Sequence, residues 1–253
     1  MHLILTGATG LVGSGVLNQM LPLVPGRISK LTILSRGPVP MAEGKPGVTV
    51  IEHKNFNEYP ASLLKRLEGA EGCVWAQGIA QSQVGREEYI TITKEYPLAA
   101  ARAFGTLADT FKFVYISGEG ATTKPGRFTQ LFATVKGECE NALLKMSTEN
   151  PSFKPYSLRP AFVDSISDEA VRQATANRQL PLSYRIMGPF TPLIRTFVPG
   201  IVSPTQDIGQ AATLLAMGDG KALEGSGVSE GGRILSNEAI RRIAKDGVFK
   251  GLW

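Results

Sequence analysis

The sequence predicts an α/β fold, a doubly wound parallel sheet covered by helices on both faces. Two observations carry this prediction. Short runs rich in β-branched residues alternate with longer segments of helical periodicity, and a glycine-rich turn follows the first run. The chain has 253 residues, 43% hydrophobic and 19% charged, so it can bury a full core, which excludes a disordered or fibrous protein. We expect a single domain over 1–253, with a small C-terminal substrate cap at about 165–205.

The expected elements follow this alternation along the chain. Strands are predicted near 2–6, 30–35, 48–52, 72–76, 112–117 and 156–159, and helices near 11–20, 60–67, 88–105 and 130–147. A helix at 206–217 and a short strand and helix at 233–245 complete the chain. The segment 181–205 contains five prolines among apolar residues and is interpreted as a wall of the substrate site, or equally as an irregular packed cap or dimer surface.

The composition indicates which binding partners and which cellular compartment to expect. The net charge of +5 is spread along the chain, without the dense basic stripe typical of a nucleic-acid binder, so we expect no nucleic-acid partner. Cys73 and Cys139 stand far apart with no histidine cluster, which favours a reducing, cytoplasmic location over a disulfide framework or zinc site. His2 and His53 are expected to be structural. We expect no secretory leader and no integral membrane segment.

The first turn has the pattern of a dinucleotide site. Residues 3–13 read Leu-Ile-Leu-Thr-Gly-Ala-Thr-Gly-Leu-Val-Gly, directly after a predicted strand and at the start of a predicted helix. Gly7 allows the tight turn, Gly10 lets the backbone approach a pyrophosphate, and Gly13 permits close packing of helix on strand. The start of the helix adds N–H donors and a positive dipole end. A Rossmann-type site is therefore predicted at Gly7, Thr9, Gly10, Leu11, Val12 and Gly13.

The end of the second strand predicts which dinucleotide is bound. An NAD site usually has an acidic residue there for the adenosine ribose, but the first Asp or Glu of this chain is Glu43. The strand ends instead in Ser35-Arg36, a hydroxyl and a guanidinium that suit a 2′-phosphate. The expected cofactor is NADP(H), with an exposed and unengaged Arg36 as the alternative.

Four motifs together carry a family resemblance. They are Thr-Gly-Ala-Thr-Gly-Leu-Val-Gly at 6–13, Tyr-Ile-Ser-Gly-Glu-Gly-Ala at 115–121, Val-Lys-Gly-Glu-Cys-Glu at 135–140 and Leu-Arg-Pro-Ala at 158–161. In this order they resemble the atypical short-chain dehydrogenase/reductases, and within them the Tat-interacting-protein-like oxidoreductase branch and its fungal relatives. The resemblance covers residues 1 to about 165 well and the remainder loosely.

The resemblance implies further cofactor contacts. By analogy with the family, the segment after the third strand lies beside the adenine, the segment after the fourth strand follows the cofactor, and the backbone beyond a proline after the sixth strand contacts the nicotinamide. The family usually has Asp where this chain has Asn55, and an amide still offers a donor and an acceptor. The implied positions are Asn55, Phe56, Ala76, Gln77, Gly78, Pro160, Ala161, Phe162 and Val163.

The implied catalytic set departs from the family at one residue. The family has a Ser after the fifth strand and a Tyr and a Lys separated by three residues on the next helix, with Tyr as acid/base and Lys lowering its pKa and holding the ribose. Ser117 and Lys136 match, but the Tyr position is Phe132. Loss of such an acid/base typically removes a factor of about 10²–10⁴ from the rate.

Three hypotheses accommodate Phe132. In the first, another hydroxyl replaces the tyrosine, and the candidates are Thr129, Thr134, Tyr184 or a substrate-bound water. In the second, the protein is an NADP(H)-binding regulator or pseudoenzyme. In the third, it catalyses a non-redox isomerisation or cyclisation on the same scaffold. The leading expectation is an NADP(H)-dependent oxidoreductase acting on a small to medium apolar carbonyl or alcohol. A homodimer through the helices near 88–105 and 130–147 is open.

Overall fold

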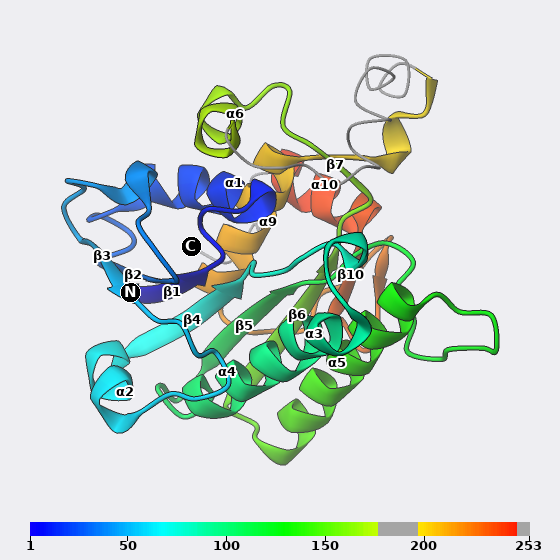
Figure 1. The fold of residues 1–253 in the computed structure, drawn as a ribbon, viewed down its shortest axis with the longest axis horizontal. Helices are drawn as coiled ribbons and strands as arrows, with labels where there is room; N and C mark the ends of the chain where they lie inside the picture. Colours follow the sequence, from blue (N-terminus) through cyan, green and yellow to red (C-terminus); the bar gives the residue numbers. More distant parts are fainter. Residues whose placement is uncertain (177–196, 247–253) are drawn as a thin grey trace.

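A computed structural model describes residues 1–176 and 197–246 of the chain. Its centre is an eight-stranded sheet in the order β3-β2-β1-β4-β5-β6-β10-β9, parallel except for the short pair β10 and β9 (Figure 1). This is the doubly wound Rossmann fold predicted from the alternating pattern. The strands are β1 (His2–Thr6), β2 (Lys30–Ser35), β3 (Val48–Glu52), β4 (Ala70–Trp75), β5 (Phe111–Ile116), β6 (Phe153–Arg159), β9 (Val228–Ser229) and β10 (Ile234–Ser236).

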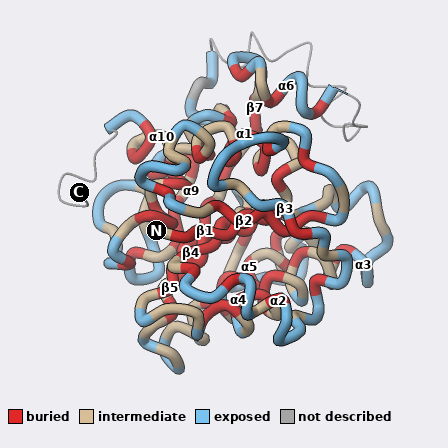
Figure 2. Tube along the Cα trace, turned by 90° about the vertical axis from the view of Figure 1, so that its left-hand side faces the viewer, coloured by how far each residue is buried: buried red, intermediate tan, exposed pale blue. Residues whose placement is uncertain are grey.

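Helices cover both faces of the sheet, as Figure 2 shows from the edge. One face packs against α1 (Leu11–Met20), α9 (Thr205–Met217) and α10 (Asn237–Asp246). The other packs against α2 (Ala61–Leu67), α4 (Tyr96–Phe104) and α5 (Leu131–Glu149). The central strands are therefore buried on both sides, which is why they are continuous apolar runs in the sequence. Short helical turns connect these elements: η1 (Leu21–Leu23), η2 (Pro40–Ala42), η3 (Gln81–Gln83) and η6 (Pro199–Ile201).

The register aligns the carboxyl ends of the central strands. Thr6 of β1 pairs with Trp75 of β4, and Trp75 pairs with Tyr115 of β5. The N–H of Ser117, just beyond β5, donates to the carbonyl of Leu158 in β6 at 2.8 Å. The residues that follow these strands consequently lie along one edge of the sheet. The strand order changes direction between β1 and β4, where ligands bind in sheets of this kind.

The helix predicted at 88–105 is interrupted by a π turn. It runs as α3 (Arg86–Ile90), η4 (Thr91–Glu95, a π-helix) and α4. Pro97 has no N–H to donate to the carbonyl four residues before it, that of Thr93. The Tyr115 hydroxyl donates to that carbonyl instead, at 2.9 Å. The π turn is thus linked to β5 through the Tyr115 hydroxyl.

Three short elements after residue 160 differ from the expectation. The strands β7 (Phe162–Asp164) and β8 (Val202–Pro204) form a separate two-stranded parallel sheet, and α6 (Glu169–Thr175) follows β7. Asp168 caps α6 by accepting a hydrogen bond from the Val171 N–H. Strands of three residues have too little pattern for the sequence to predict them. Residues 177–196, with most of the expected substrate wall and Tyr184, lie outside the described residues.

Candidate functional site

The glycine-rich turn is built by two close backbone approaches. Gly7 has a φ of +71°, and a Cβ there would lie 2.5 Å from the carbonyl carbon of Ala76. A Cβ on Gly13 would lie 2.0 Å from the carbonyl oxygen of Gly7. The Gly10 N–H closes the turn with a 2.8 Å hydrogen bond to the Gly7 carbonyl. Side chains at Gly7 or Gly13 would therefore push α1 away from the sheet.

The N-terminus of α1 is open to an anion. Gly10 is its N-cap residue, no side chain caps the helix, and its first turn contains no acidic residue. The first N–H groups of a helix have no partner within the helix and carry its positive dipole end. Leu11, Val12 and Gly13 are the first residues of α1 and supply these groups. This combination suits a phosphate.

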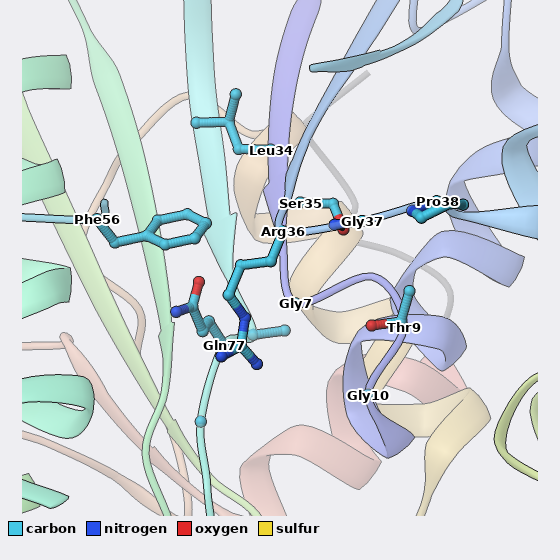
Figure 3. A pocket seen from close by; sticks show the side chains of 12 residues that line it. Gly7, Thr9, Gly10, Leu34, Ser35, Arg36, Gly37, Pro38, Phe56 and Gln77 are labelled. Carbon is cyan, nitrogen blue, oxygen red and sulfur yellow. Dashed lines mark hydrogen bonds between the residues drawn. The ribbon is translucent and has the colours of Figure 1, made fainter. Parts of the chain in front are cut away.

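A cavity of about 460 Å³ opens over this turn (Figure 3). It unites the ends of β1, β2 and β4, three segments that are distant in the sequence. Nine of the predicted cofactor positions line it. The lining residues are Gly7, Thr9, Gly10, Leu34, Ser35, Arg36, Gly37, Pro38, Phe56, Ala76, Gln77 and Gly78.

Arg36 and Ser35 supply the polar side of the cavity at β2. The Arg36 side chain points from the end of β2 into the cavity in the direction of Gln77 (Figure 3). It is exposed and forms no ion pair with any described residue. The Ser35 hydroxyl accepts only a long bond from the Gly37 N–H, at 3.4 Å. Both side chains are thus available to an anionic ligand.

The two positions after β3 behave differently. Phe56 is buried and lines the cavity, packed edge-on against Trp75 with 5.8 Å between ring centroids. Asn55 is exposed and does not line the cavity, and its Oδ1 accepts a bond from the Asn57 N–H in a local turn. Phe56 therefore forms an apolar wall, whereas Asn55 shapes the loop that carries it.

Ser117 and Lys136 meet at the end of β5. Lys136 Nζ donates to the carbonyls of Ile116 at 3.3 Å and Ser117 at 2.6 Å. Ser117 is 3% exposed, and its hydroxyl has no hydrogen-bond partner among the described residues. The next residue, Gly137, lets α5 pack closely, since a Cβ there would lie 1.7 Å from the Thr122 carbonyl oxygen. The Lys136 amine is thereby held against the backbone of Ile116 and Ser117 at the end of β5.

The surroundings of Lys136 contain a buried ion pair. Glu140, one helical turn further along α5, is fully buried, and Arg159 donates to both of its oxygens at 3.0 and 2.5 Å. Burial lowers the pKa of Lys136 to about 8, against the opposing charge of Glu140. The spacing of Glu140 from Lys136 was visible in the sequence, but its pairing with Arg159 depends on how α5 packs on β6.

Phe132 occupies the expected tyrosine position in the first turn of α5. Its N–H donates to Gln81 Oε1 at 3.1 Å, which links the helix start to the loop after β4. Its ring lies against Gly120, where a Cβ would be 3.4 Å from the ring Cζ. Of the alternative hydroxyls, Thr134 donates to the Gln130 carbonyl and Thr129 accepts from the Gly126 N–H.

The segment after β6 is held by a network that sequence reasoning missed. The Ala161 N–H donates to Ser203 Oγ at 2.7 Å, and Ser203 Oγ donates to Asn237 Oδ1 at 2.6 Å. Asn237 Nδ2 donates to the carbonyls of Gly200 and Val202. The network fixes the residues beyond Pro160 to β8 and to the start of α10. Phe162 and Val163 lie within β7 itself.

Asn237→Ala is expected to lower the free energy of unfolding by about 2 kcal/mol or more, because the buried Ser203 hydroxyl loses the acceptor of its proton and two carbonyls lose their side-chain donor. Urea denaturation measures this change. The matched control is Asn141→Ala, which removes one exposed bond to the Thr123 carbonyl. An effect no larger than that of the control would contradict a structural role for the network.

The remaining candidates have structural surroundings. His2 is hydrogen-bonded to Thr32 Oγ1 at 2.8 Å, and burial lowers its pKa to about 4. His53 packs against the rings of Phe56 and Tyr59. Within 1–176 and 197–246, no three His, Cys, Asp or Glu side chains gather where they could hold a metal ion. No helix in the same ranges has the length and apolar character to cross a bilayer.

Comparison with solved structures gives the fold first. Two similar solved structures are the aldohexose dehydrogenase of Thermoplasma acidophilum (TM-score 0.61, 17% identity, 85% of this chain and 86% of that one) and the enzyme WbmF of Bordetella bronchiseptica in complex with NAD⁺ (TM-score 0.66, 12% identity, 97% and 77%). These structures have the fold of this chain, so the fold that the resemblance implied is confirmed.

Relatives in fungi then give the family. The leucinostatins biosynthesis cluster protein T of Purpureocillium lilacinum is 35% identical over 261 residues, which cover 95% of this chain and 94% of that protein. The botcinic acid biosynthesis cluster B protein 16 of Botryotinia fuckeliana is 37% identical over 153 residues, 58% of this chain and 96% of that protein. No family model matches the sequence. The chain belongs to the family of these fungal biosynthesis-cluster proteins.

Proposed function

We propose that the protein is an NADP(H)-dependent oxidoreductase that acts on a small to medium apolar carbonyl or alcohol. The observation that carries the proposal is the cavity over the glycine-rich turn, which Ser35 and Arg36 also line. The residues fit the cofactor on three counts: glycines where a Cβ would fill the cradle, an uncapped helix N-terminus, and a guanidinium without an ion pair among the described residues. A dehydrogenase and an enzyme in complex with NAD⁺ that have this fold agree with the proposal.

Each segment of the cofactor would have its own partners. The start of α1 would hold the diphosphate, Ser35 and Arg36 the 2′-phosphate, and Phe56 and Gln77 the adenine side of the cavity. Lys136 would hold the nicotinamide ribose, and the backbone at 161–163 the nicotinamide. Bound there, NADPH would supply a hydride to a carbonyl carbon. Ser117 would orient the substrate by donating from its unpartnered Oγ to the carbonyl oxygen.

The substrate belongs to specialised metabolism in this proposal. Both fungal relatives are named for biosynthesis clusters, one for leucinostatins and one for botcinic acid. We therefore expect an intermediate of such a pathway rather than a sugar. The domain organisation proposed with it is a single unit with a cap from about 165 to 205.

Arg36→Ala is expected to weaken NADPH binding by a factor of about 10–100 and to leave NADH binding unchanged, because a charge-assisted hydrogen bond to the 2′-phosphate is lost. Calorimetric titration with NADPH and NADH measures both affinities. Arg102→Ala, which removes an equal charge from the exposed face of α4, is the control. Wild-type protein that binds neither dinucleotide would refute the proposal, and an equal loss for both would refute the role of Arg36.

A further inference from the structure

The loop between β5 and α5 holds an aromatic side chain out in solvent. Phe128 is 93% exposed, whereas phenylalanine is among the residues most often buried. The loop around it is closed by its own hydrogen bonds, from the Gly126 N–H to Thr129 Oγ1 at 2.8 Å and from the Thr129 N–H to the Gly126 carbonyl at 3.1 Å. Asn141 of α5 donates to the Thr123 carbonyl at the base of the loop. The exposed ring therefore belongs to a loop of defined conformation.

Two cations stand beside this ring in the sequence. Lys124 and Arg127 are exposed, and neither forms an ion pair with a described residue. The sequence has no Asp or Glu between Glu119 and Glu138, so no carboxylate of the loop offsets their charge. An exposed aromatic ring next to such cations suits a surface that is both apolar and negatively charged.

A second group of exposed apolar side chains precedes β8. Phe197 and Val198 are 76% and 49% exposed, and Ile201 of η6 is 44% exposed. The sequence contains no acidic residue from 170 to 206. Exposed apolar side chains that gather on one short turn indicate a contact surface, whereas those scattered singly do not.

The loop and the turn both lie next to the connection from β6 to β7. The Glu119 N–H, at the start of the loop, donates to the Pro160 carbonyl at 2.8 Å. Phe162 pairs with Val202, which directly follows Ile201. In Figure 1 the loop, in green, and the turn, in yellow, project from the right-hand side of the molecule. We call their exposed side chains the loop and turn surface, which consists of Lys124, Arg127, Phe128, Phe197, Val198 and Ile201.

We propose that the loop and turn surface binds the interface of a membrane that contains anionic lipids. The apolar side chains enter the boundary between headgroups and acyl chains, and Lys124 and Arg127 lie against the anionic headgroups. Burial of apolar area and attraction to anionic lipid add to each other in such contacts. A second copy of the chain would bring the same cations against each other, which disfavours self-association through this surface.

This contact needs neither cofactor nor turnover. None of the six side chains lines the cavity over the glycine-rich turn. Lipid binding and NADPH binding are therefore measured separately, and the failure of either leaves the other standing. An apolar substrate would concentrate in the same bilayer, and only this last link rests on the proposed function.

Sedimentation with vesicles tests the contact on the full chain. Vesicles of phosphatidylcholine that contain about 30% phosphatidylserine are compared with vesicles of phosphatidylcholine alone. We expect the partition coefficient to be about 25-fold higher with phosphatidylserine, about fivefold for each of the two cations. Raising NaCl from about 0.1 M to about 0.5 M is expected to remove most of this difference, because salt screens the attraction.

Variants of the surface are expected to weaken binding to the phosphatidylserine vesicles. Phe128→Ala and Phe197→Ala should each lower the partition coefficient by about tenfold, because one aromatic ring no longer enters the interface. Lys124→Ala combined with Arg127→Ala should lower it by about 25-fold and abolish the preference for phosphatidylserine. Phe128 is almost fully exposed, so its removal leaves the fold intact.

Matched controls lie across the molecule. Val50→Ala removes an exposed apolar side chain from the edge strand β3. Lys65→Ala combined with Arg66→Ala removes two exposed cations from the last turn of α2, which lies on the left-hand side of Figure 1. The controls are expected to change the partition coefficient by less than about twofold, because charges beyond a Debye length from the lipid are screened.

The outcomes decide the proposal. Loss of vesicle binding in the loop and turn variants, with the NADPH affinity and the urea midpoint of the wild type, supports it. Absence of wild-type binding to phosphatidylserine vesicles would overturn it and turn the search to an acidic protein surface. Equal binding to both kinds of vesicle, or an equal loss in the control variants, would overturn it as well.

Discussion

Gly13→Val is expected to abolish NADPH binding and to lower the free energy of unfolding by about 3 kcal/mol or more. Even a Cβ at this position would lie 2.0 Å from the Gly7 carbonyl oxygen and 2.5 Å from its carbon. Both are backbone atoms of the turn, so the strain is relieved only if α1 moves away from β1. The same movement would displace the N–H groups that would hold the diphosphate.

Chemical denaturation and calorimetry on one preparation measure both effects of Gly13→Val. Gly85→Ala is the control, because a Cβ at Gly85 meets nothing within 4 Å and its φ of −67° suits any residue. It is expected to shift stability by less than about 1 kcal/mol. Retention of wild-type NADPH affinity in Gly13→Val would show that the turn is not the diphosphate site.

Phe132→Tyr is expected to raise the rate of carbonyl reduction by about 100-fold, because it supplies the phenol that the resemblance expects as acid/base. Position 132 lies one helical turn before 136 on α5, so the charge of the Lys136 ammonium would favour ionisation of a phenol there. NADPH affinity is expected to stay within about fivefold.

Steady-state kinetics of the wild type and of Phe132→Tyr measure this gain directly. Phe128→Tyr, which adds a phenol at a 93% exposed position, controls for a phenol outside the site. No gain in Phe132→Tyr would indicate that another group supplies the proton or that the reaction is not a carbonyl reduction. A large gain would mean that the natural protein lost its acid.

The sequence predicted the fold well because the strands carry a strong pattern. β1, β2 and β5 are runs of buried apolar residues, and the expected helices at 11–20, 130–147 and 206–217 match α1, α5 and α9 to within two residues. The π turn was missed because periodicity over five residues differs little from that of an α-helix. Only Pro97, together with Tyr115 on a distant strand, accounts for it.

The candidate site was predictable in parts. The glycine-rich turn and Ser35-Arg36 follow from local spacing, and the structure brings them into one cavity. The pairing of Glu140 with Arg159 and the network through Ser203 and Asn237 join segments 19 to 42 residues apart. Such contacts depend on how elements pack in three dimensions, and neither hydrophobic period nor motif spacing contains that information.

The hydrogen bonds of Ser203 and Asn237 connect three segments that are separate in the sequence. Ala161, β8 and the first residue of α10 are tied by hydrogen bonds through Ser203 and Asn237, three of which are 2.7 Å or shorter. A movement of these three segments relative to one another would break several buried hydrogen bonds at once. We therefore expect them to move together as one rigid body.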